Sequence, residues 1–128
     1  FEALKPTVAR LTAVGIVVSL FIEPARDQLE AAVALGAPVV ELHTGTYCNL
    51  PEDRRPAELE RLADAARRGH GLGLRINAGH GLNYDNLPAF LRAVPHLDTL
   101  NIGHSIVARA VLTGMEQAVR DMKECLRA

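Results

Sequence analysis

Four short apolar runs, separated by amphipathic stretches, constrain the fold of this 128-residue chain more than any other feature. The runs are rich in β-branched residues and contain few polar ones, a pattern typical of parallel strands that are covered on both faces. They span residues 16–22, 38–43, 72–77 and 97–102. Because strands that alternate with helices predict a parallel sheet, we expect an α/β protein.

The segments around these runs carry apolar residues at helical spacing. We expect helices at residues 1–14, 28–35, 57–68, 86–93 and 115–126. Asp85 is predicted to cap the fourth helix, and Thr113 with Glu116 to form a capping box for the last. Residues 44–56 are expected to form a polar loop, and residues 103–110 a short helical turn. Four strand–helix units fit either an open doubly wound sheet or half of a closed barrel, and the pattern alone does not choose.

Composition excludes several classes of protein. The net charge is −1 without a basic stripe, so we expect no nucleic-acid partner. No apolar run approaches the ~20 residues that a membrane span needs, so no membrane partner is expected. The two cysteines, Cys48 and Cys125, lie far apart without a C-x-x-C spacing. A disulfide framework is therefore not expected, a reducing, cytoplasmic location is, and a reactive thiol at Cys48 stays open as an alternative.

Ionisable side chains gather where three of the predicted strands end. Glu41 and His43 share one face of the second strand, His80 follows the third strand and His104 follows the fourth. Since the carboxyl ends of parallel strands form the active-site rim of α/β folds, we expect these side chains to converge. Structural alternatives remain open: an ion pair between Glu41 and Arg75, a strand-end hydrogen bond at His43, and a simple turn at His80.

An Asn-x-Gly-His pattern occurs twice, at residues 77–80 and 101–104, after neighbouring predicted strands. The glycines on both sides of His80 favour a backbone that approaches a ligand closely. The second copy opens a helical turn at Gly103, where free N–H groups favour an anion such as phosphate. The alternative at that point is a tight turn capped by Ser105. Three histidines and a glutamate could bind zinc in principle, but no H-x-H or H-E-x-x-H spacing supports a metal site.

Five segments of the chain, taken in order, carry a resemblance to a known family. They are Val-Ser-Leu-Phe-Ile at 18–22, Val-Glu-Leu-His-Thr-Gly at 40–45, Leu-Arg-Ile-Asn-Ala-Gly-His-Gly-Leu-Asn at 74–83, Leu-Asn-Ile-Gly-His at 100–104 and Ile-Val-Ala-Arg-Ala-Val-Leu-Thr-Gly at 106–114. Each is weak alone, but the ordered set is highly specific. On these residues the chain resembles the pyridoxine 5'-phosphate synthase family.

The resemblance implies a fold and an assembly. Members of that family are TIM, or (β/α)8, barrels with extra helices, and they assemble as homo-octamers. The matching segments place residues 1–128 in the carboxy-terminal half of a single barrel domain, covering about the last four βα units. The family's first half holds its general-base residues, so we expect this stretch of chain to be inactive alone.

The resemblance also implies an activity. The family condenses 1-deoxy-D-xylulose 5-phosphate with 3-amino-2-oxopropyl phosphate to form pyridoxine 5'-phosphate, phosphate and water, without a metal or organic cofactor. By matching position, His80 is expected to be the proton donor and Glu41 the transition-state stabiliser. Gly81, Gly103 and His104 are expected to hold the aminoketone phosphate.

Two rival interpretations remain. The first is another phosphate-binding barrel enzyme, an aldolase or isomerase. A lysine at a strand end would favour a Schiff-base aldolase, but the only lysines, Lys5 and Lys123, lie on predicted helices. The other rival is a non-enzymatic half-barrel that binds phosphometabolites or a partner chain. The presence of the family's remaining strands in the same protein would discriminate it from the enzyme.

Overall fold

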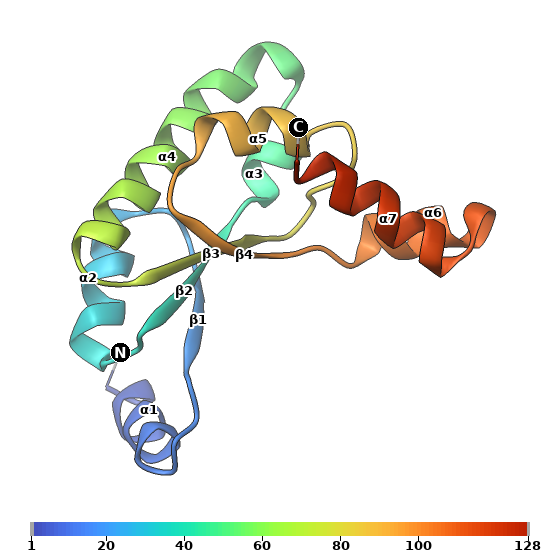
Figure 1. Cartoon of the computed structure of the whole chain (residues 1–128). Coiled ribbons are helices and arrows are strands. Elements are labelled where there is room, and N and C mark those ends of the chain that lie inside the picture. Colours follow the sequence, from blue (N-terminus) through green and yellow to red (C-terminus); the bar gives the residue numbers. More distant parts are fainter. Residues whose placement is uncertain (1, 128) are drawn as a thin grey trace.

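A four-stranded parallel sheet organises the structure, a computed structural model that describes residues 2–127 (Figure 1). The strands pair in sequence order: β1 (Ser19–Ile22), β2 (Val39–His43), β3 (Arg75–Gly79) and β4 (Leu97–Asn101). Each of the four predicted runs overlaps one of these strands, although β3 extends two residues past its run, so the α/β assignment is confirmed. The strands run in parallel, and their carboxyl ends therefore meet at one edge of the sheet.

Helices connect the strands and flank the sheet. They are α1 (Leu4–Ala13), α2 (Arg26–Leu35), α3 (Gly45–Asn49), the 3-10 helix η1 (Glu52–Arg54), α4 (Arg55–Gly71), α5 (Leu87–Ala93), α6 (His104–Thr113) and α7 (Met115–Cys125). The loop predicted at residues 44–56 is therefore wrong, because α3 and η1 lie within it. The short turn predicted at 103–110 is a helix of 10 residues.

Both predicted helix caps are also wrong. The residue before α5 is Asn86 rather than Asp85, and it makes no side-chain cap. Instead, the Asn83 carboxamide oxygen accepts the N–H groups of Asp85 and Asn86, so a local asparagine turn replaces the cap. Thr113 still belongs to α6, where its hydroxyl donates to the Arg109 carbonyl at 3.2 Å, so it cannot cap α7.

The main core lies between one face of the sheet and helices α2, α4 and α5, which gather on the same side in Figure 1. Its largest fully buried side chains include Leu29, Leu42, Leu62, Ile76 and Phe90. The opposite face, called the open face below, carries Phe21, Glu41, His43 and Asn77. Phe21 is 58% exposed, so within residues 2–127 the sheet is not covered on both faces as its apolar runs predicted.

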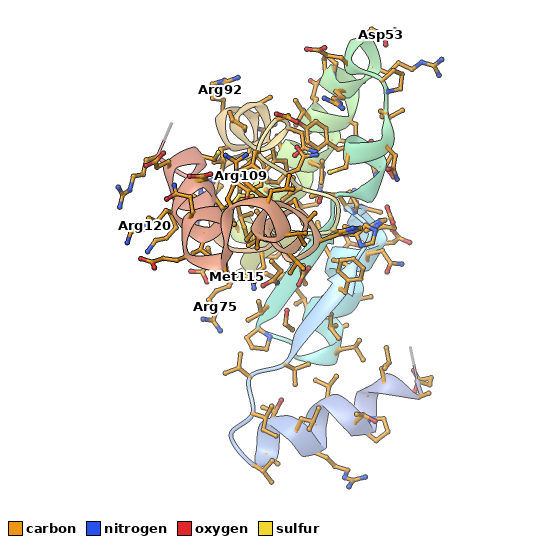
Figure 2. All side chains as sticks on the ribbon, turned by 90° about the vertical axis from the view of Figure 1, so that its right-hand side faces the viewer. Asp53, Arg75, Arg92, Arg109, Met115 and Arg120 are labelled. Atoms are coloured by element: carbon orange, nitrogen blue, oxygen red, sulfur yellow. The ribbon has the colours of Figure 1, made fainter. Side chains whose placement is uncertain are left out.

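Helices α6 and α7 form an arm that projects beyond β4 (Figures 1 and 2). An ion pair between Arg109 and Asp121 joins the two helices. The Tyr84 hydroxyl, which donates to the Ala118 carbonyl at 3.0 Å, fixes α7 to the rest of the molecule. The arm leaves apolar side chains in the open, because Val111 is 81% and Leu112 88% exposed.

Among residues 2–127, no helix is both long enough and apolar enough to span a bilayer.

We expect Phe90→Ala to lower the free energy of unfolding by about 3–5 kcal/mol, because Phe90 is fully buried and its removal leaves a cavity in the main core. Chemical denaturation with a circular-dichroism readout measures this. Leu112→Ala is the matched control, and its effect should stay within about 0.5 kcal/mol because the side chain is exposed. Equal losses in the two variants would contradict the placement of the core.

Candidate functional site

An open pocket of about 560 Å³ lies where the strands end. Its lining includes all five site residues that the sequence predicted: Glu41, His80, Gly81, Gly103 and His104. Phe21, Asn49, Leu82, Asn101 and Ile102 complete it. The convergence of these groups on one rim is therefore found in the structure.

Glu41 reaches across the open face to β4. Its Oε2 accepts a hydrogen bond from Asn101 Nδ2 at 2.5 Å. The carboxylate passes over Gly79, where a Cβ atom would overlap Glu41 Oε1 and lie 2.9 Å from the Asn101 carbonyl oxygen. The alternative ion pair with Arg75 is not formed, because Arg75 pairs with Val39 at the other end of the strand and is exposed.

One polar atom next to this carboxylate has no partner. Asn77 pairs with Glu41 in the sheet, and its Oδ1 is buried without a hydrogen bond among the described residues. Buried polar atoms of this kind are rare in native proteins and need an explanation. The pairing register places this unused acceptor beside Glu41.

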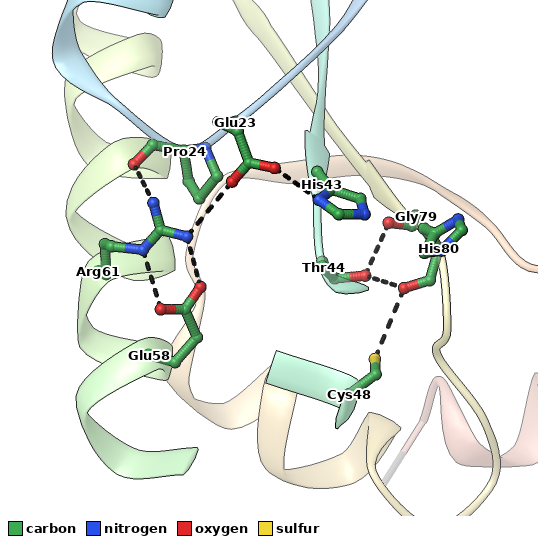
Figure 3. A network of polar contacts seen from close by, with 9 residues as sticks. All are labelled: Glu23, Pro24, His43, Thr44, Cys48, Glu58, Arg61, Gly79 and His80. Atoms are coloured by element: carbon green, nitrogen blue, oxygen red, sulfur yellow. Dashed lines mark hydrogen bonds and ion pairs between the residues drawn. The ribbon is translucent and has the colours of Figure 1, made fainter. Parts of the chain in front are cut away.

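His80 sits in a backbone conformation that is unusual for its residue type. Its φ is +83°, in the left-handed region, and Gly81 follows with φ +84°. Fully buried Thr44 supports this turn, since its hydroxyl oxygen lies 2.7 Å from the carbonyl oxygens of both Gly79 and His80 (Figure 3). His80 therefore occupies a braced position and not a simple surface turn.

The two Asn-x-Gly-His copies lie on neighbouring strands, as predicted, but they are not level. Gly79 of the first copy pairs with Asn101 of the second. The second copy therefore extends further along the strand direction, and it places His104 at the first position of α6. This offset leaves room for the pocket between the two motifs.

The amino end of α6 faces the pocket with free donors. Gly103 precedes the helix without a side-chain cap, and the first helical bond joins the Val107 N–H to the Gly103 carbonyl. The Ser105 hydroxyl donates to the Leu82 carbonyl at 2.9 Å, so the predicted alternative of a Ser105 cap is wrong. Unpartnered N–H groups at a helix start attract anions, including phosphate.

Sequence reasoning missed two residues that shape this site. Glu23, which directly follows the first predicted run, forms a hydrogen bond with His43 Nδ1 at 2.7 Å. Thr44, placed in a polar loop, braces the His80 turn. Only the position of each residue directly after a strand could have indicated a role.

Cys48 lies under the His80 turn, with its sulfur 3.6 Å from the His80 carbonyl oxygen. Burial raises the pKa of the Cys48 thiol above its ordinary value. A raised pKa means less thiolate at neutral pH, so the structure does not favour the alternative of a reactive thiol. Across residues 2–127, no group of three or more His, Cys, Asp or Glu side chains is arranged to hold a metal ion.

Comparison with known proteins decides the family. Residues 1–128 match the family described as pyridoxal phosphate biosynthesis protein PdxJ. This chain belongs to the PdxJ family.

Curated relatives in this family are named pyridoxine 5'-phosphate synthase. One from Akkermansia muciniphila is 54% identical over 123 residues, which are 96% of this chain and 50% of the relative. One from Thioalkalivibrio sulfidiphilus is 54% identical over 125 residues, again 96% of this chain and 50% of the relative. One from Photobacterium profundum is 51% identical over 95% of this chain and 50% of the relative. The chain thus spans about half the length of these PdxJ-family proteins.

In this PdxJ-family chain we expect Gly79→Ala to displace the Glu41 carboxylate and to destabilise the fold by about 1–3 kcal/mol, because the new Cβ overlaps Glu41 Oε1. Denaturation in wild-type and Glu41→Ala backgrounds measures the coupling. The loss should shrink when Glu41 is already gone. Gly71→Ala, where a Cβ meets nothing within 4 Å, is the control. An identical loss in both backgrounds would show that Glu41 does not occupy this space.

We also expect Cys48 to react slowly with iodoacetamide. At about pH 8 its rate should fall below that of a cysteine in a short unstructured peptide, since the raised pKa leaves less thiolate. The rate should increase as the pH rises further. A Cys125→Ser variant isolates the Cys48 signal in a mass-spectrometric time course. Reaction faster than the peptide would overturn the burial argument.

Proposed function

We propose that this chain is the carboxy-terminal half of a (β/α)8 barrel and that the complete barrel is a pyridoxine 5'-phosphate synthase. Four consecutive parallel βα units in sequence order support this proposal, because they are the arrangement of half a barrel. The open face adds support, because the exposed Phe21 side chain on it would be covered by the other half of a barrel. The family and the names of the relatives supply the reaction.

The proposed reaction joins 1-deoxy-D-xylulose 5-phosphate and 3-amino-2-oxopropyl phosphate to give pyridoxine 5'-phosphate, inorganic phosphate and water. One observation carries the assignment of the site: a carboxylate, an imidazole and an uncapped helix start line the same pocket. Both substrates are phosphorylated, and the ring closure eliminates water. A pocket for this reaction needs an anion site and an acid, and the uncapped helix start and the imidazole are the groups proposed for these roles.

His80 is the proposed proton donor to the departing water. Its side chain is exposed to the pocket while its backbone is fixed by Thr44, so the imidazole can meet a substrate without a moving loop. A positioned acid of this kind contributes roughly 10²–10⁴-fold to a rate. Gly81, Gly103 and His104 are the proposed cradle of the aminoketone phosphate.

Glu41 is the proposed stabiliser of positive charge in the transition state. The Asn101 amide fixes its carboxylate at the inner end of the pocket, and a charge held in place needs no reorganisation during the reaction. The reaction proposed here uses no metal and no organic cofactor. The general bases are proposed to come from the other half of the barrel, so the chain alone is expected to be inactive, and the complete protein is expected to form a homo-octamer.

The test is an assay for pyridoxine 5'-phosphate from the two named substrates. The chain is measured alone and together with the other half of the Akkermansia muciniphila relative, the part that this chain does not match. Product is expected only from the mixture. His80→Ala should then lower kcat by about 10²–10⁴-fold. His70→Ala, which removes an exposed histidine of α4, should leave kcat unchanged.

Each other outcome has a definite meaning. Product from the chain alone would show that the general bases are misplaced. No product from folded material that also fails to bind 3-amino-2-oxopropyl phosphate would favour the non-enzymatic half-barrel. A loss in His70→Ala as large as in His80→Ala would remove the special role of His80.

A further inference from the structure

Glu23 and His43 form a hydrogen-bonded pair beside the pocket, at the ends of β1 and β2 (Figure 3). Glu23 Oε1 lies 2.7 Å from His43 Nδ1. A carboxylate only accepts hydrogen bonds, so the hydrogen of this bond resides on Nδ1. In neutral His43, the other ring nitrogen, Nε2, therefore carries a lone pair.

The His43 ring is in turn packed against His80. The two ring centroids are 4.9 Å apart at an interplanar angle of 53°. Gly45 makes this packing possible, because a Cβ there would lie 2.5 Å from His43 Nε2 and 2.9 Å from His80 Cδ2. Phe21 meets the His43 ring edge-on at a centroid distance of 5.2 Å and lies 6.4 Å from the His80 ring. The otherwise exposed His80 side chain is thus supported on one side by two rings.

Helix α4 also contacts Glu23, through the side chain of Arg61. An Arg61 guanidinium nitrogen lies 3.5 Å from Glu23 Oε2 and 2.6 Å from Glu58 Oε1. Arg61 also donates to the Pro24 carbonyl at 3.3 Å, next to Glu23 in the chain. Polar contacts therefore run from helix α4 through Glu23 to His43, and ring packing continues from His43 to His80.

Stability alone does not account for this pair. The Glu23 side chain is 52% exposed and that of His43 26% exposed, and ion pairs in such surroundings contribute little to folding. Neither residue lines the pocket, so neither is placed to bind a substrate directly. What the pair does contact is the imidazole that lines the pocket.

We propose that Glu23 and His43 are positioning residues for His80: Glu23 fixes the His43 ring through its Nδ1–H, and the fixed ring holds the His80 imidazole in place at the pocket. This inference rests on the proposed role of His80 as proton donor. Residues that lock the side-chain conformation of a functional group by packing and hydrogen bonds contribute to activity without touching the substrate.

The first test observes the pair without any reaction. The 128-residue chain is prepared with ¹⁵N-labelled histidine, and NMR determines which nitrogen of His43 carries the hydrogen. We expect the hydrogen on Nδ1 in the wild type and its redistribution in Glu23→Ala, together with loss of the nuclear Overhauser contacts between the His43 and His80 rings. Glu30→Ala is the matched control, because Glu30 is also 52% exposed and bonded at 2.7 Å, but to Arg26 on the surface of α2.

The second test is kinetic and uses the two-half complex described above. Glu23→Ala should lower kcat about tenfold with KM within about twofold, because an orienting partner is lost while the phosphate cradle is intact. In a His80→Ala background the same substitution should have no further effect, since its role acts through His80. Glu30→Ala should leave both constants unchanged.

Three results would overturn the inference: a His43 hydrogen on Nε2 in the wild type, His43–His80 contacts unchanged in Glu23→Ala, or an equal tenfold loss in the His80→Ala background. If the wild-type complex forms no product, the proposed function fails. The NMR measurement then still decides whether Glu23 orders the two rings.

Discussion

The attachment of Thr44 to the turn after β3 is the interaction on which the rest of the site depends. Its N–H donates to the Gly79 carbonyl at 3.0 Å, and its hydroxyl lies within 2.7 Å of the carbonyls of Gly79 and His80. These bonds extend the pairing of β2 and β3 past the end of both strands. Because Thr44 is fully buried, solvent does not compete for them, and the loop that carries His80 becomes a continuation of the sheet.

Glycines, which have no side chain, leave space that the side chains of the site occupy. Gly45 leaves the space that His43 and His80 fill, and Gly79 leaves the space through which Glu41 reaches Asn101. At Gly81, a Cβ would lie 2.8 Å from the Cβ of Cys48. The ionisable groups are thus positioned by close backbone approach, which allows short side chains to meet from three different strands.

The sequence predicted the parts of the structure that follow from the spacing of apolar residues and from the order of strands and helices along the chain. Apolar runs that alternate with amphipathic stretches predicted the parallel sheet, and the rule that strand ends share an edge predicted that Glu41, His80 and His104 lie together. The sequence could not predict contacts that depend on the direction in which a side chain points. An ion pair between Glu41 and Arg75 is one alternative that the sequence leaves open, but the carboxylate reaches across β3 to Asn101 on β4, through the space that Gly79 leaves. The Glu23–His43 bond joins residues on neighbouring strands, and no local pattern encodes it.

The left-handed backbone of His80 lowers the stability of the fold at a position whose side chain lines the pocket. A residue with a Cβ in this conformation costs about 1–2 kcal/mol relative to glycine, which adopts it freely. Glycine at position 80 would therefore relieve this cost, whereas the histidine there places an imidazole on the pocket.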